Sequence, residues 1–374
     1  MLPAPKSDAA SLADVLKSSW EAIRGEPNRL GLPPVDNAVV LLVDGLGADQ
    51  LKSRSGHART MASALTSKSV IESGFPTTTA AALASLTTGV SSGQHGLVGY
   101  TVLDAAHDRV VNQLSGWDDR LDPATWQLSP TLFERAAAQG IDAIAVGPAR
   151  YVDSGFTHAV LRGARYLPAA TIADRMQRAL DEVKASGRHL IYLYVPELDQ
   201  AAHAHGADSA EWIRALETTD GALAALTAGL GRRDGLLVTA DHGLLDIPQH
   251  NHVLLEDGPL LNGVRFVAGE PRCLQLHLEP GVDAEGVAAR WREAEGARAW
   301  IATRDEAVAA GWFGTVAPEV LPRIGDVIVA ARKAVAYYDA RVTGPNGRSM
   351  VGQHGSWSPA ELRVPLLRFG AFAR

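Results

Sequence analysis

The sequence has a single cysteine, Cys273, among its 374 residues. It therefore cannot form an intramolecular disulfide or a cysteine-rich zinc site, and any transition metal must be held by His and carboxylate side chains. No apolar run approaches the roughly 20 residues that a membrane-spanning helix requires. Residues 1–17 lack the basic segment and apolar stretch of a secretory signal. We expect a soluble cytoplasmic protein.

Positive charge is also scarce. Lys and Arg number 35 against 42 Asp and Glu, which gives a net charge of −7. This balance argues against a dedicated nucleic-acid-binding protein, which would normally present a basic face. It does not argue against an anionic substrate, because bound cations can dominate the charge of a local site.

Several apolar runs end in polar or turn residues, as strands buried on both faces of a sheet do. These predicted strands are 38–43, 141–146, 189–195 and 235–240. Helical patterns are present at 8–24, 79–88, 130–139, 170–186 and 209–230. Strands that alternate with helices predict an α/β fold with a mainly parallel central sheet and helices on both faces.

The pattern changes between 253 and 348. Strand-like runs at 272–278 and 326–331 lie among helical patterns at 283–294 and 304–310. We predict a smaller α+β insertion or cap over 253–348. Residues 1–252 together with 349–374 would then form the main, catalytic core.

Polar side chains lie just past the ends of three of the predicted strands. Asp44 follows the first, Asp199 the third, and the adjacent pair Asp241 and His242 the fourth. Ligands of such sheets gather at the carboxyl ends of the strands. Asp44 alone is equally well explained as a turn residue. A dinucleotide-binding motif fails there, because Gln50 occupies the third glycine position.

Further histidines and threonines complete a candidate metal site. Asp199 and His203 lie four residues apart and would share one face of a helix, although a solvated helix face is the alternative. His354 lies in a Gly-Gln-His-Gly turn. Three threonines at 77–79 precede a small-residue helix, where they could be N-caps or bring a hydroxyl to a phosphate. A threonine is an effective nucleophile only beside a base or a metal.

Together these residues suffice for two metal ions, with three protein ligands each, and one threonine oxygen. Two-metal sites of this kind clamp the attacking and leaving oxygens of a displacement at phosphorus. The set consists of Asp44, Thr79, Asp199, His203, Asp241, His242 and His354.

The motifs and their order resemble the alkaline phosphatase superfamily, specifically its type I phosphodiesterase/nucleotide pyrophosphatase branch. The resemblance covers about 38–100, 189–243 and 350–366. It implies two zinc ions, although Mn²⁺ or Fe would also suit such ligands. The implied ligands are Asp44, Asp241 and His242 for one ion, and Asp199, His203 and His354 for the other.

The resemblance also implies a reaction. The family's nucleophile corresponds to Thr79, with Thr78 as the alternative, and it forms a phosphothreonine intermediate that water then hydrolyses. The bond cut would be a phosphodiester or pyrophosphate bond in a small phosphate ester, with a nucleotide as one candidate. Phosphonoacetate hydrolase-like or phosphomonoesterase activity at the same site is an alternative. A non-catalytic metal-binding protein is a more distant one.

Two positions depart from the family pattern. Ala80 stands where an aromatic residue often stacks on a nucleotide base, and Tyr100 stands where a phosphate-binding asparagine is expected. The Tyr100 hydroxyl is our candidate for hydrogen bonding the phosphate, and Tyr151 is a second candidate for contacting the substrate. No membrane association and no particular oligomeric state is predicted.

Overall fold

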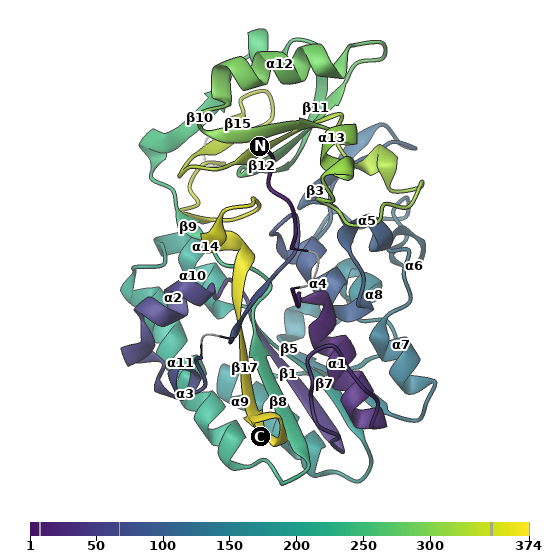
Figure 1. Cartoon of the computed structure of the whole chain (residues 1–374), viewed down its shortest axis with the longest axis vertical. Helices are drawn as coiled ribbons and strands as arrows, with labels where there is room; N and C mark the ends of the chain where they lie inside the picture. The colour runs from purple at the N-terminus through teal and green to yellow at the C-terminus, as the bar shows by residue number, and fades with distance from the viewer. Residues whose placement is uncertain (7–8, 67, 345–346, 374) are drawn as a thin grey trace.

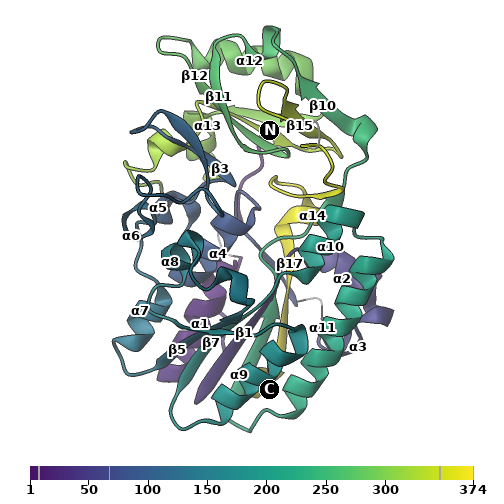
Figure 2. The ribbon, with the colours of Figure 1, turned by 180° about the vertical axis from the view of Figure 1, so that it is seen from behind.

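The computed structural model describes residues 1–374 except 7–8, 67, 345–346 and 374. Its two large sheets lie toward opposite ends of the long axis of the molecule (Figure 1). The view from behind shows the same division, with helix α4 (Thr79–Thr88) between the two sheets (Figure 2). In the described part of the chain, no helix is long and apolar enough to cross a membrane.

The larger sheet has seven strands in the order β2-β17-β8-β1-β7-β5-β6. In this order their bounds are Val70–Glu72, Arg363–Gly370, Asp234–Thr239, Asn37–Val43, His189–Val195, Asp142–Gly147 and Arg165–Pro168. The strands from β8 to β6 are parallel, whereas β17 runs antiparallel to both of its neighbours. The predicted α/β fold with a mainly parallel sheet is confirmed. The antiparallel strand near the C-terminus was not predicted.

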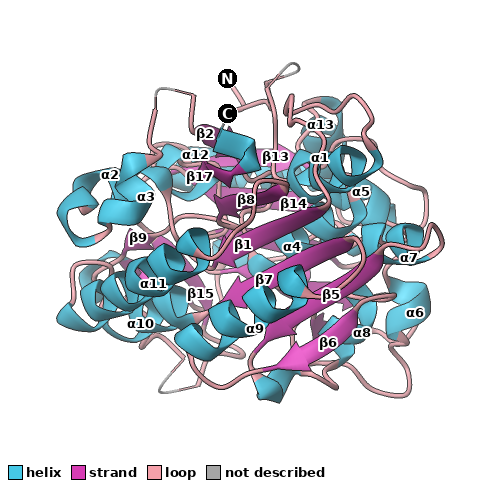
Figure 3. Ribbon diagram, turned by 90° about the horizontal axis from the view of Figure 1, so that it is seen from below, coloured by secondary structure: helices cyan, strands magenta, loops and turns pink. Residues whose placement is uncertain are grey.

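Helices cover both faces of this sheet, which explains why its central strands are uninterrupted apolar runs. Every residue of β1 is buried. Helices α9 (Ile172–Lys184) and α11 (Ala210–Ala228) lie on one side, and α1 (Ala13–Arg24) and α7 (Leu132–Ala137) lie on the other (Figure 3). All four lie close to the predicted helical segments.

Helix α4 is buried along its whole length, and it carries one of the candidate site residues at its start. It lies against α1, α5 (Ser92–His95), α7 and α8 (Gly155–Val160). Its Ala, Ser and Thr side chains are small enough for such close packing. Gly89 ends the helix in the left-handed conformation, with a φ of 73° that glycine adopts without strain.

The second sheet is antiparallel and has six strands in the order β13-β14-β12-β11-β3-β4. In this order their bounds are Ala299–Thr303, Val327–Ala331, Cys273–Leu278, Val264–Glu270, Thr101–Asp104 and Arg109–Asn112. Helices α12 (Ala284–Glu295) and α13 (Arg304–Ala309) accompany it. Strands β3 and β4 come from an earlier part of the chain, so the sheet combines two separate stretches. The assignment of 253–348 as a separate insertion stays a prediction.

Shorter elements and a buried ion pair join the two parts. Arg272, beside β12, donates from Nε and Nη2 to the two carboxylate oxygens of Glu361, at 2.7 Å each, and both side chains are fully buried. Glu361 belongs to α14 (Pro359–Leu362), which leads into β17. The remaining elements are α2 (Ala48–Ser53), α3 (Arg59–Ser63), α6 (Pro123–Trp126), α10 (Glu197–His205), β9 (Leu245–Asp246), β10 (His252–Leu255), β15 (Ala336–Asp339) and β16 (Gly352–Gln353).

Candidate active site

The site forms at the carboxyl ends of three neighbouring strands. Strand β1 pairs with β8 on one side and with β7 on the other. Asp44 follows the end of β1 directly, and Asp241 and His242 follow β8. Because parallel strands end at the same edge of a sheet, these three side chains converge there. We call Asp44, Asp241 and His242 the buried group.

The potential ligand atoms of the buried group lie within 4.8 Å of one another. His242 Nε2 is 3.5 Å from Asp44 Oδ1 and 3.4 Å from Asp241 Oδ2. The other Asp241 oxygen accepts hydrogen bonds from the backbone N–H of Gly45 and of His242, at 3.1 Å each. The two oxygens nearest to His242 Nε2 are buried and have no hydrogen-bond partner. They are therefore open to an ion.

A second group consists of Asp199, His203 and His354, and we call it the helix group. Asp199 and His203 share one face of α10, as their spacing predicted, with His203 Nε2 3.0 Å from Asp199 Oδ2. His354 follows β16, and its Nε2 is 3.9 Å from Asp199 Oδ1, which is also buried without a partner. The potential ligand atoms again lie within 4.8 Å of one another.

The three histidines are oriented in the same way. The Nδ1 atoms of His242, His203 and His354 lie 3.1, 2.7 and 2.8 Å from the backbone carbonyl oxygens of Gly243, Gly352 and Thr77. A carbonyl oxygen can only accept, so each Nδ1 carries the proton and donates it. With the proton fixed on Nδ1, the lone pair that a neutral ring offers to an ion is on Nε2, which faces the carboxylates. This is the usual arrangement of histidine as a metal ligand.

Thr79 adjoins both groups. It is the first residue of α4, and its Oγ1 lies 3.2 Å from His242 Nε2. The rings of His242 and His354 stack with centroids 3.5 Å apart, so the two groups are neighbours. Thr78 occupies the N-cap position, and Thr77 Oγ1 donates to the carbonyl of Ser356 at 2.8 Å. The three threonines therefore have different contacts, and Thr79 is the one hydrogen-bonded to His242.

Three carboxylates crowd this small volume, and the pKa values of Asp44 and Asp199 are shifted. Burial raises the pKa of Asp44 well above its ordinary value, and the charges of Asp241 and Asp199 add to the rise. Burial also acts to raise the pKa of Asp199. The charge of His203 and the hydrogen bond between His203 and Asp199 outweigh the effect of burial, so the pKa of Asp199 is lowered. Buried carboxylates are stable when they are paired or coordinate cations. Oxygen and imidazole donors with unpartnered oxygens fit one divalent ion in each group.

Members of both groups and Thr79 line a cavity of about 290 Å³. Its described lining residues include no Lys or Arg. Tyr100, the predicted substrate-binding residue, also lines the cavity and is 40% exposed. Its backbone N–H donates a hydrogen bond to Glu270 Oε2 at 3.0 Å. Glu270 was not predicted, because no motif marks it and it reaches the site only through the pairing of β11 with β3.

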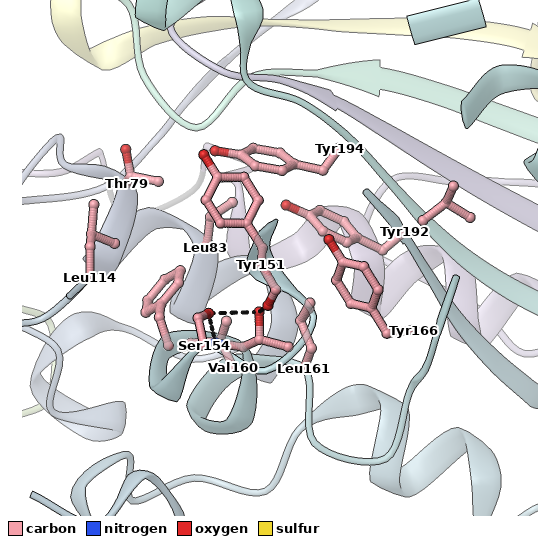
Figure 4. Close-up of a pocket in the computed structure, with 13 residues that line it drawn as sticks. Thr79, Leu83, Leu114, Tyr151, Ser154, Val160, Leu161, Tyr166, Tyr192 and Tyr194 are labelled. Carbon is pink, nitrogen blue, oxygen red and sulfur yellow. Dashed lines mark hydrogen bonds between the residues drawn. The ribbon is translucent and has the colours of Figure 1, made fainter. Parts of the chain in front are cut away.

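A pocket rich in tyrosine adjoins this cavity and shares Thr79, Tyr151 and Tyr194 with it (Figure 4). Tyr192 and Tyr194 project from the same face of β7, and their rings stack with centroids 6.0 Å apart. Tyr151, a predicted substrate contact, lies 6.0 Å from the Tyr194 ring, and the Tyr194 hydroxyl donates to Asp44 Oδ2. Aromatic side chains thus flank Thr79, although its neighbour in sequence is an alanine.

The family model for type I phosphodiesterase/nucleotide pyrophosphatase matches residues 38–357. The chain belongs to this family, and the resemblance drawn from the motifs is confirmed. Ectonucleotide pyrophosphatase/phosphodiesterase family member 3 of Mus musculus is 25% identical over 229 residues, and that of Rattus norvegicus is 27% identical over 178 residues. These matches cover 58% and 46% of this chain, but only 26% and 20% of the relatives' own length.

Solved structures share the fold. Human ectonucleotide pyrophosphatase/phosphodiesterase 5 has a TM-score of 0.69 and 16% identity, with 89% of this chain and 87% of that chain covered. An inactive threonine-to-alanine variant of the murine protein, in complex with AMP, has a TM-score of 0.67 and 16% identity, with 89% and 88% covered. Phosphonoacetate hydrolase from Sinorhizobium meliloti, in complex with phosphonoformate, has a TM-score of 0.70 and 16% identity, with 90% and 91% covered.

Proposed function

We propose that the protein is a metal-dependent hydrolase that cuts phosphodiester or pyrophosphate bonds with Thr79 as its nucleophile. Membership in the phosphodiesterase/nucleotide pyrophosphatase family supports this reaction class. The observation that carries the proposal is the position of Thr79 Oγ1, 3.2 Å from His242 Nε2 and beside buried carboxylate oxygens that have no partner. A hydroxyl in such surroundings is suited to attack once cations are bound.

In this proposal each group holds one divalent ion, with zinc as the first candidate and Mn²⁺ or Fe as alternatives. The ligands are Asp44, Asp241 and His242 for one ion, and Asp199, His203 and His354 for the other. Such ions would supply the positive charge that lowers the pKa of the nucleophile and stabilises the leaving oxygen.

The chain itself supplies orientation and a covalent partner. The first turn of the ten-residue α4 presents Thr79 at the positive end of the helix, where backbone N–H groups attract phosphate oxygens. Thr79 Oγ1 would form a bond to phosphorus while the bond from phosphorus to the leaving oxygen breaks. Water would then cleave the phosphothreonine and restore the hydroxyl, in a two-step covalent mechanism.

Two properties of the cavity favour a diester over a monoester. Its described lining residues include no Lys or Arg to neutralise the second charge of a monoester. The tyrosine pocket beside Thr79 offers aromatic faces to an organic substituent. The AMP complex of the murine relative makes a nucleotide one candidate for the substrate. The proposal includes a cytoplasmic location, with which a single cysteine is consistent.

The test is a comparison of substrates with purified, zinc-loaded protein. We expect bis-p-nitrophenyl phosphate to be hydrolysed faster than p-nitrophenyl phosphate or phosphonoacetate, and a chelator to abolish the activity. A preference for phosphonoacetate or for the monoester would assign the same site to the alternative reaction. Zinc binding without turnover of any of the three would favour the non-catalytic alternative.

A further inference from the structure

Glu270 reaches the catalytic cavity from the second sheet. It is the last residue of β11, is 6% exposed, and lines the same cavity as Thr78 and Thr79. One of its oxygens, Oε2, accepts the hydrogen bond from the backbone N–H of Tyr100, and the Thr78 hydroxyl is a second donor to the carboxyl. The other oxygen, Oε1, is buried and has no partner.

The surroundings hold this side chain in place. Gly355, next to His354, has a φ of 136°, and a Cβ atom there would lie only 2.4 Å from Glu270 Cγ. The Glu270 side chain is therefore packed between the loop that carries His354 and the segments that carry Thr78 and Tyr100. A buried polar atom without a partner calls for one, and Glu270 lines the cavity that a substrate would occupy.

No ion pair of the described residues neutralises Glu270. The neighbouring Arg272 is fully engaged with Glu361, and the groups that face Glu270 are Glu361, the Cys273 thiol, and the donors Tyr100 and Thr78. Burial raises the pKa of Glu270 to about 8, against the hydrogen bonds from Tyr100 and Thr78, and the charge of Glu361 adds to the rise. Burial without a neutralising cation therefore favours the protonated form of this carboxyl at neutral pH. The proton belongs on Oε1, because Oε2 accepts.

We propose that Glu270 is a substrate-binding residue whose neutral carboxyl donates a hydrogen bond from Oε1 to a non-bridging oxygen of the phosphate that Thr79 attacks. This inference rests on the proposed function. The hydrogen bond lets a cavity without Lys or Arg hold a phosphate monoanion, and no proton is transferred. An ionised Glu270 could only repel the same anion, so substrate binding weakens when this carboxyl ionises.

Binding is measured in a Thr79→Ala background, so that no turnover occurs. Calorimetry gives the Kd of bis-p-nitrophenyl phosphate for the zinc-loaded protein at about pH 6.5 and about pH 9.5, on either side of the Glu270 pKa. Glu270→Gln keeps a neutral donor of similar size, and Glu270→Ala removes the donor. The control is Glu295→Gln, because Glu295 is equally buried but pairs with Arg298 and Tyr337 in the second sheet's own core.

In the protein with Glu270 unchanged, and in the Glu295→Gln control, the diester should bind about 30-fold more weakly at the higher pH than at the lower one. This factor is expected if the diester binds only when a group with a pKa of about 8 is protonated. The Kd of the Glu270→Gln variant should differ by less than about 3-fold between the two pH values, and the Glu270→Ala variant should bind the diester weakly at both. The proposal is overturned if the Gln variant weakens as steeply as its parent, or if the Ala variant binds as tightly.

A measurement on the Thr79→Ala protein with Glu270 unchanged covers the case in which the Glu270 variants do not fold. Infrared spectroscopy should show a protonated carboxyl band at neutral pH that shifts on addition of bis-p-nitrophenyl phosphate and is lost near the Glu270 pKa. The absence of any shift on addition of the diester contradicts the inference. These readouts differ from that of the proposed function: failure of the Thr79-intact protein to hydrolyse any diester would refute the hydrolase proposal, while the binding results test Glu270 alone.

Discussion

The buried group and the helix group contain the same kinds of residue, but they are built differently. In the buried group, Asp44 and Asp241 follow adjacent strands, and the side chains of Asp44, Asp241 and His242 are 4%, 0% and 0% exposed. In the helix group, two residues come from α10 and one from a distant loop. There the side chains of Asp199, His203 and His354 are 11%, 23% and 11% exposed.

This difference indicates that the two groups have different roles. Sheet hydrogen bonding fixes the strand ends that carry the buried group, and Thr79 is hydrogen-bonded to that group through His242. The helix group depends on the relative position of a helix and a loop, and it is closer to solvent. We therefore expect the buried group to activate the nucleophile and to release its ion more slowly than the helix group does.

The largest effect should come from the nucleophile. Thr79→Ala should lower kcat on bis-p-nitrophenyl phosphate by roughly 10³-fold or more, because the covalent step is lost. Thr78→Ala is the matched control, since the preceding hydroxyl contacts Glu270 rather than His242, and it should lose no more than about 10-fold. Steady-state kinetics measures both. If Thr78→Ala abolished the activity and Thr79→Ala remained fully active, the nucleophile would be Thr78 instead of Thr79.

Removal of one histidine from each group should separate the two groups. His242→Ala should lose activity more severely than His203→Ala, because His242 is hydrogen-bonded to Thr79, the proposed nucleophile. Metal analysis after dialysis should find about one ion retained in each variant, with the helix-group ion lost from the His203 variant. Loss of both ions from the His203 variant, with both retained by the His242 variant, would reverse the comparison.

A smaller effect should come from the tyrosine that supports the buried group. Tyr194→Phe removes the hydroxyl that donates to Asp44 Oδ2 and should weaken metal binding about 10-fold, the size typical of groups that orient a ligand. Tyr192→Phe is the control, because its buried hydroxyl has no hydrogen-bond partner among the described residues. Competition with a chelator of known affinity measures both. Equal affinities of the two variants would show that the hydrogen bond does not support the ligand.

The sequence predicted the parts of the fold and site that depend on local pattern. Continuous apolar runs located β1, β7 and β8, and the polar residues after them converge because parallel strands end together. The spacing of Asp199 and His203 placed them on one helix face without knowledge of the fold. Their roles as metal ligands stay proposals.

Features made by long-range pairing were not predictable in this way. The direction of β17 depends on its pairing with β8 and β2, and its continuous buried run at 364–367 is compatible with either direction. Glu270 enters the cavity because β11 pairs with β3, whose sequence lies more than 150 residues earlier in the chain. The tyrosine pocket combines β7 with Tyr151, which lies in a separate segment.

The most direct test of the proposed two-metal site is anomalous diffraction from crystals of the zinc-loaded protein. Two zinc peaks are expected, one among Asp44, Asp241 and His242 beside Thr79, and the other among Asp199, His203 and His354. Zinc bound elsewhere, or a single ion shared by all six side chains, would contradict the two-metal site.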